Sequence, residues 1–184
     1  MKCGGEQFEL DQIDLQILAS LQEHGRIPVV KLAEQVGLSA PSVVERIKKL
    51  EDGGIITGYH ASLDAKKLGQ DVTAFIGVSI ADAKKISSFE ATVPTLDDVL
   101  ECHHVTGQHT MLLKVRTRDT SSLEELIRTV RLIEGVARTE TMVVLSTHTE
   151  RTQLAIRPGA GREGAEARRH RHSARNGLGE PKKV

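Results

Sequence analysis

Apolar residues recur at three- and four-residue steps through the first third of the chain, which is the period of a helix with one buried face. The pattern predicts helices over residues 10–24, 29–36 and 40–52. A Gly-Leu-Ser turn separates the second helix from the third, and Ser39 followed by Pro41 is typical of a helix N-terminus. Two short helices joined in this way indicate a helix-turn-helix within residues 10–60.

From residue 71 the pattern changes to apolar stretches of strand length that alternate with amphipathic helical segments. It predicts strands over 72–80, 99–105, 110–116 and 137–147, and helices over 83–93 and 120–133. The order βαββαβ is typical of a ferredoxin-like layer, in which an antiparallel sheet carries helices on one face. Because the opposite face also needs a cover, we expect the protein to form homodimers.

The chain is therefore predicted to be an α+β protein that joins an N-terminal helix-turn-helix to a C-terminal ferredoxin-like βαββαβ sandwich. Its expected parts are a flexible N-terminus at 1–9, a helix-turn-helix domain with a wing or linker strand at 10–60, a linker at 61–70, the ferredoxin-like domain at 71–156 and a disordered basic tail at 157–184. Residues 55–60 are the strand expected at the end of the first domain.

The distribution of charge bears on any role in binding DNA. The 25 basic residues balance the 25 acidic ones overall, but residues 157–184 hold eight Lys and Arg against three Asp and Glu. Residues 1–60 hold six basic and nine acidic residues, so the helix-turn-helix part is not basic as a whole. The low hydrophobicity of the tail predicts disorder, and the tail could be either a basic arm on DNA phosphates or a solvated extension.

Composition narrows the class of protein further. Hydrophobic residues make up 39% of the chain and aromatic residues 2%, so the cores must consist of aliphatic side chains. No apolar run approaches the roughly 18–20 residues that span a bilayer, and the first ten residues do not have the pattern of a secretory signal. Cys3 and Cys102 are too few for a disulfide framework. We expect a cytoplasmic protein without a membrane partner.

Residues 10–156 resemble the Lrp/AsnC family of feast/famine transcriptional regulators. The stretches that carry the resemblance are LDQIDLQIL at 10–18, GRI at 25–27, LA at 32–33, VGLSAP at 36–41, RIKKLE at 46–51, GIITGY at 54–59, ECHHVTG at 101–107, LLKV at 112–115, EGV at 134–136 and TET at 139–141. No single stretch is decisive, but their order and spacing together are strongly specific.

The resemblance implies a winged helix-turn-helix that binds palindromic, double-stranded promoter DNA, which would place the protein at the nucleoid. It also implies a C-terminal domain that builds homodimers and larger assemblies, tetramers or octamers, with an amino-acid effector bound between dimers and no other cofactor. The strand at 55–60 would link the two domains and take part in dimer pairing.

The third helix is the expected recognition helix, with Val44, Ile47 and Leu50 facing inward and Val43 beside them. The residues expected to contact DNA are Ser39, Ser42, Arg46, Lys48 and Lys49. The serines can donate to a phosphate or a base edge, the guanidinium suits guanine or phosphate, and the two lysines suit phosphates.

By the same resemblance, the loop at 105–110 is the expected effector site. Its residues are Val105, Thr106, Gly107, Gln108, His109 and Thr110, with Thr139, Glu140 and Thr141 as expected partners. Gly107 permits a tight turn whose amides can hold a carboxylate. Many relatives carry an acidic residue shortly after that glycine, where this chain has Gln108 and Thr110. The difference favours a polar amino acid or a changed ligand, and Glu140 could supply the negative charge for an α-ammonium group.

Three alternative functions stay open. The loop could pack dimers without binding an effector. A metal-responsive regulator could use Cys102, His103, His104 and His109, but successive strand residues point to opposite faces, and Cys102 is more typical of a small buried residue. An enzyme is the third alternative, because some haem-biosynthesis decarboxylases are similar in fold to this family. The sequence contains no Ser-His-Asp, Cys-His or phosphate-loop arrangement, which disfavours catalysis.

Overall fold

A computed structural model describes residues 9–156, so the flexible N-terminus expected at 1–9, apart from Glu9, and the basic tail expected at 157–184 lie outside the described residues. The chain divides into two compact units. One comprises residues up to Ala61 together with the segment from Arg151 onward, and the other comprises Ser62–Glu150. Residues 144–150, directly after the last strand, belong to the sheet unit, and residues 151–156 are grouped with the helix-turn-helix.

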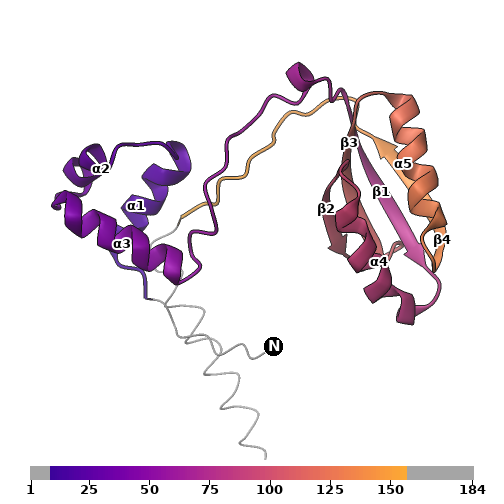
Figure 1. Cartoon of the computed structure of the whole chain (residues 1–184), viewed down its shortest axis with the longest axis horizontal. Helices are drawn as coiled ribbons and strands as arrows, with labels where there is room; N and C mark the ends of the chain where they lie inside the picture. Colours follow the sequence, from indigo (N-terminus) through magenta and orange to yellow (C-terminus); the bar gives the residue numbers. More distant parts are fainter. Residues whose placement is uncertain (1–8, 157–184) are drawn as a thin grey trace, which may run out of the picture. The chain divides into compact units, whose positions relative to one another are not determined.

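The first unit is built from three helices, α1 (Gln12–Glu23), α2 (Val29–Val36) and α3 (Ala40–Asp52) (Figure 1). Asp11 caps α1 in a reciprocal capping box with Asp14, and Ser39 caps α3, which has proline in its first turn. The helices enclose a core of Ile17, Leu32, Ala33, Val43 and Leu50. The expectation for Val44 was wrong: it is 52% exposed, because the inward stripe of α3 runs through Val43 instead.

The strand expected at 55–60 is not formed within the described residues. Residues 55 and 56 are a bend, and residues 57–60 have no regular structure. The side-chain pattern of these residues suits a strand, but a strand also requires a partner for its backbone hydrogen bonds. No other segment of the described part of the chain pairs with residues 55–60.

The second unit is a four-stranded antiparallel sheet in the order β2-β3-β1-β4. Its strands are β1 (Val72–Ile80), β2 (Val99–His104), β3 (Met111–Thr117) and β4 (Val136–Val143). Helices α4 (Ile86–Thr92) and α5 (Thr120–Leu132) lie beside it in Figure 1, and short 3₁₀ turns η1, η2 and η3 occupy Lys66–Leu68, Ala83–Lys85 and Val93–Thr95. The predicted βαββαβ order is confirmed.

Both helices pack on one face of the sheet, so every second residue of each central strand enters the core. That core comprises Ala74, Ile76, Val78, Phe89, Val93, Met111, Leu113, Val115, Leu123, Leu126 and Val130. The remaining residues of the central strands lie on the opposite face, which we call the open face. Its middle is formed by Thr73, Phe75, Gly77 and Ser79 from β1 with Leu112, Lys114 and Arg116 from β3.

Two local expectations for this unit were wrong. Cys102, expected to be buried, is exposed, because β2 is an edge strand at the margin of the helix layer. The last strand ends at Val143 rather than at residue 147, since its neighbour β1 begins at Val72 and Val144 donates the final hydrogen bond, to the carbonyl of Thr73.

Across residues 9–156, no helix has the length and apolar character needed to cross a membrane.

Candidate DNA-reading and effector sites

Arg46 projects from α3 onto the N-terminus of α1. Its Nη1 donates to Asp11 Oδ2 at 2.7 Å and to Asp14 Oδ1 at 2.8 Å. Asp14 is 4% exposed, and its other oxygen accepts the backbone N–H of Asp11. The pKa of the Asp11 carboxyl is lowered, mainly because the Asp14 backbone N–H donates to it and also because Arg46 faces it. Arg46 thus joins α3 to the capping box of α1.

The other residues expected to contact DNA lie on the exposed surface of α3. Ser39 Oγ accepts the backbone N–H of Ser42 at 3.4 Å, and the two hydroxyls are 2.8 Å apart. Lys48 and Lys49 are exposed. The exposed Val44 lies beside these polar groups on the same helix, where an apolar side chain could contact a thymine methyl group.

Two basic residues that the sequence analysis did not single out lie near the start of α2. Arg26 and Lys31 line a shallow hollow at the turn between α1 and α2, together with His24 and Gln35. The first helix of a helix-turn-helix crosses the DNA backbone, so cations at this position suit phosphates. The sequence could have indicated both residues, because they flank Pro28, the residue at which α2 begins.

Thr110, the last residue of the loop between β2 and β3, hydrogen-bonds to the end of β1. Thr110 donates its backbone N–H to the carbonyl of Val78 at 2.9 Å, and its hydroxyl accepts the N–H of Ile80 at 3.1 Å. Thr110 also accepts from the N–H of Val105, which closes the loop. Gly107, at the tip, has φ 122°, a backbone conformation that favours glycine. Within residues 9–156, the amides of Gly107 and Gln108 have no acceptor.

His109 lies on the open face, against the backbone of Gly77. A Cβ on residue 77 would come within 2.6 Å of Nε2 and 2.7 Å of Cγ of this ring, so only glycine leaves room for it. The ring Nδ1 is 3.4 Å from Ser79 Oγ, and Nε2 is 3.5 Å from Glu140 Oε2. The sequence did hold one signal for this packing, because a glycine inside an apolar strand marks a close approach.

The three residues expected from β4 do not lie together. Glu140 is opposite Gly77 in the sheet register and reaches His109 on the open face. Thr139 and Thr141 are opposite Val78 and Ile76, whose side chains enter the core, so both threonines lie on the helix face. Thr139 Oγ1 accepts a hydrogen bond from Arg131 of α5 at 2.7 Å. Period-two alternation therefore separates Glu140 from both threonines within one chain.

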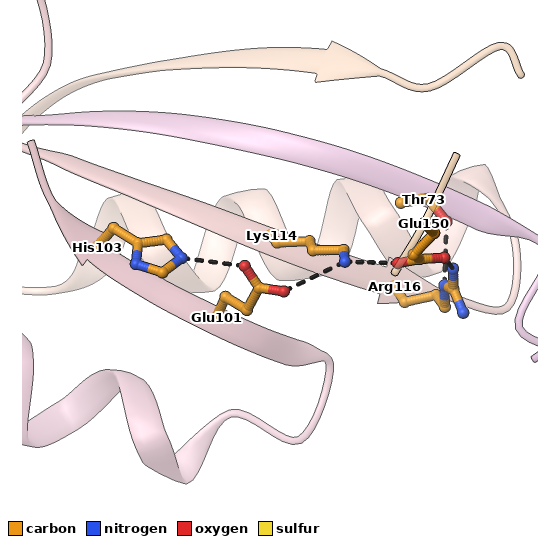
Figure 2. Close-up of polar contacts among 6 residues, drawn as sticks. All are labelled: Thr73, Glu101, His103, Lys114, Arg116 and Glu150. Carbon is orange, nitrogen blue, oxygen red and sulfur yellow. Dashed lines mark hydrogen bonds and ion pairs between the residues drawn. The ribbon is translucent and has the colours of Figure 1, made fainter. Parts of the chain in front are cut away.

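The rest of the open face carries a row of alternating charges, which Figure 2 shows. Lys114 Nζ lies 3.2 Å from Glu101 and 2.6 Å from Glu150, and Arg116 Nη2 lies 3.3 Å from Glu150. The row is completed by His103, which contacts Glu101 at 3.0 Å. The pKa of Glu150 is lowered chiefly by the hydrogen bond from Lys114.

In the described part of the chain, no three His, Cys, Asp or Glu side chains are grouped to hold a metal ion.

A three-helix unit with an exposed, capped recognition helix, followed by a ferredoxin-like domain, defines a two-domain DNA-binding regulator. Comparisons with known proteins agree with this class. Residues 10–51 match the AsnC-type helix-turn-helix domain, and residues 73–154 match the Lrp/AsnC ligand binding domain. The chain belongs to the Lrp/AsnC family of helix-turn-helix transcriptional regulators, as its motifs had predicted.

Individual relatives match over most of their length. The HTH-type transcriptional regulator YezC of Bacillus subtilis is 43% identical over 75% of this chain and 95% of its own. The structure of Escherichia coli AsnC is 34% identical, with a TM-score of 0.75 over 79% of this chain and 99% of that one. The complex of the regulator NMB0573 from Neisseria meningitidis with L-methionine gives 34% identity and a TM-score of 0.77, over 80% and 97%.

Proposed function

We propose that this protein is a sequence-specific DNA-binding regulator whose operator affinity responds to an amino acid bound at the loop between β2 and β3. No enzymatic step forms part of the proposal, and DNA as the target implies action at the nucleoid in the cytoplasm. The observation that carries the proposal is the helix α3, capped by Ser39, with Lys48 and Lys49 exposed on a compact three-helix unit.

Within this proposal, the five expected DNA-binding residues have three roles. Ser39, the N-cap of α3, and Ser42, in its first turn, would contact base edges or phosphates, while Lys48 and Lys49 would contact phosphates. Arg46 is held by two carboxylates of α1, which supports a role in orienting the recognition helix rather than a direct contact with DNA. A phosphate contact through Arg46 would first have to break these ion pairs.

DNA binding is tested with the protein and duplexes from the upstream region of its own gene, at several salt concentrations. Replacing Lys48 with alanine should weaken binding to every duplex alike and reduce the slope of log affinity against log salt by about 0.9, the value for one phosphate contact. Lys84→Ala, an exposed lysine of the second unit, is the matched control and should change neither quantity. If the wild-type protein shows no preference for any duplex, the regulatory function is wrong.

We further propose that a second copy of the chain covers the open face. The charged row is self-complementary, because cations and anions alternate along it and each sign can meet the other in a twofold arrangement. Phe75 and Leu112, both half-buried in the single chain, lie on the same face and would be covered as well. Such a dimer would give nuclease protection of two half-sites separated by about one turn of DNA, and larger assemblies would extend it.

The proposed effector site rests on two chemically matched features of the second unit. The amide groups of Gly107 and Gln108 could donate to an α-carboxylate, and Glu140, on the same sheet face as His109, could accept from an α-ammonium group. The neighbour bound to L-methionine is a regulator of similar fold and supports an amino acid as the ligand class. Gln108 and His109 favour a polar side chain on that amino acid.

A panel of the amino acids, each added to the operator-binding assay, tests the effector. One amino acid should change operator affinity, and Glu140→Gln should weaken its binding about tenfold or more by removing a charge-assisted hydrogen bond. Thr141→Ala is the control, because Thr141 lies on the opposite sheet face. An effector can act only by binding two states unequally. If saturating amino acids change neither affinity nor assembly, the protein is a regulator without an amino-acid effector.

A further inference from the structure

The outermost surface of α3 differs from the one expected from the sequence. Side chains three and four residues apart are neighbours on a helix. Pro41, Val44 and Lys48 follow this spacing and are all exposed, so they form one strip along the helix. The fully buried Val43 and Leu50 lie on the other side, in the core. We call Pro41, Val44 and Lys48 the outer strip.

The first half of the outer strip is apolar. Val44 is 52% exposed, and Pro41 beside it is exposed as well. The core of the unit takes Val43 and Leu50 from this helix, so the fold does not need Val44 inside. Single exposed aliphatic side chains are common on protein surfaces, and position decides their meaning. Under the proposed function, the N-terminal half of α3 faces the base edges in the major groove, and Val44 lies in that half.

The chemistry of valine limits which base edge this position can recognise. Its side chain has no donor or acceptor, so it contributes only by covering apolar surface. In the major groove, thymine alone presents a methyl group, while the other bases present only hydrogen-bonding groups. Lys48 follows one helical turn later, about 6 Å along the axis, where a cation suits a phosphate at the margin of the groove. The outer strip thus joins an apolar contact to a charged one.

We propose that Val44 reads a thymine of the operator by packing its methyl groups on the C5 methyl group of that base. The inference rests on the proposed function, since it names a base recognised by the same helix. Unlike a phosphate contact through Lys48, this contact carries sequence preference. It also adds to the expected DNA-binding residues one that makes no hydrogen bond, which is why a search for polar side chains passes over it.

The test replaces thymine with uracil, which lacks the C5 methyl group, in the upstream duplex that the protein prefers. Wild-type affinity should fall about fourfold for each covered methyl group, the effect of one buried methyl or methylene group. Val44→Ala should bind the uracil duplex about as well as wild type does, and its own preference for thymine over uracil should disappear. Placing uracil at one thymine at a time identifies the base concerned. Val44→Thr, which has the same shape and keeps one methyl group, should give an intermediate preference.

Val30→Ala is the matched control, because Val30 is an exposed valine of the same unit on α2, with 61% of its surface exposed. It should keep the full preference for thymine. Circular dichroism should give all these variants the melting temperature of wild type, within a few degrees. Equal wild-type affinity for thymine and uracil duplexes would overturn the inference, and so would a preference that survives Val44→Ala. Failure of the proposed function appears separately, as equal wild-type affinity for the upstream duplex and a scrambled one.

Discussion

Replacing Arg46 with alanine is expected to destabilise the helix-turn-helix unit by about 2–3 kcal/mol, because the buried Asp14 carboxylate loses its cationic partner. The exposed fraction of the Asp14 side chain is 6%, and that of Arg46 is 30%, so water can compensate the loss only in part. For a unit of this size, the change corresponds to a fall in melting temperature on the order of 10 °C. Circular dichroism, which follows the loss of helix, measures it.

The same variant distinguishes an orienting role from a direct contact with DNA. Lys48→Ala, on the same helix, should leave the melting temperature unchanged, and Arg46→Lys should fall between wild type and alanine because it keeps the charge. If Arg46 acts by orienting α3, the folded Arg46→Ala variant, measured well below its melting temperature, should bind the operator with an affinity close to that of wild type. An unchanged melting temperature together with weak operator binding would instead assign Arg46 to the DNA contact first predicted from the sequence.

Placing alanine at Gly77 should displace His109 from the open face and destabilise the second unit by about 1–3 kcal/mol. The three heavy atoms nearest to a Cβ at this position all belong to the His109 ring. The ring would therefore lose its approach to Ser79 and Glu140 and project from the face proposed to pair with a second copy. Thermal unfolding and sedimentation velocity measure the two consequences, lower stability and weaker assembly.

A double variant makes the Gly77 prediction specific. Because the clash is with one side chain, adding His109→Ala to Gly77→Ala should restore most of the lost stability. The stability change of the double variant should therefore differ from the sum of the two single changes. Ser79→Ala, two residues along the same strand and on the same face, adds no atom near the ring and should change the free energy of unfolding little. Equal stability of Gly77→Ala and wild type would show that His109 does not need the space above this glycine.

Much of the fold follows from local signals in the sequence. Helices α2 and α3 begin and end at the predicted residues, and β1 spans the predicted 72–80. Their limits depend on neighbours in sequence: Ser39 as cap, Gly37 as stop and the period of apolar positions. Two adjacent valines show where this reasoning fails. The predicted inward stripe of α3 contained Val44 with Val43 beside it. Successive helix residues point about 100° apart, and only Val43 is buried, whereas Val44 is 52% exposed.

The candidate sites were harder to predict, because their contacts join residues far apart in the chain. Arg46 was singled out correctly as a notable cation, but its partners Asp11 and Asp14 lie 35 and 32 residues away. The sequence likewise placed Glu140 in the effector group together with Thr139 and Thr141. Period-two alternation along β4 separates Glu140 from the two threonines, and the register of β4 against β1 places Glu140 on the open face.

The sequence by itself determined the order of elements, the division into a DNA-reading part and a ferredoxin-like part, and the family, because periodicity, caps and spaced motifs are properties of neighbouring residues. Only the tertiary structure decided which charges are paired, which face of the sheet is open, and that Gln153 and Leu154 hydrogen-bond to Gln22 of α1. Those outcomes depend on side chains that meet across the fold, such as Gln22 with Leu154 and His109 with Gly77, and their meeting is set by packing and register.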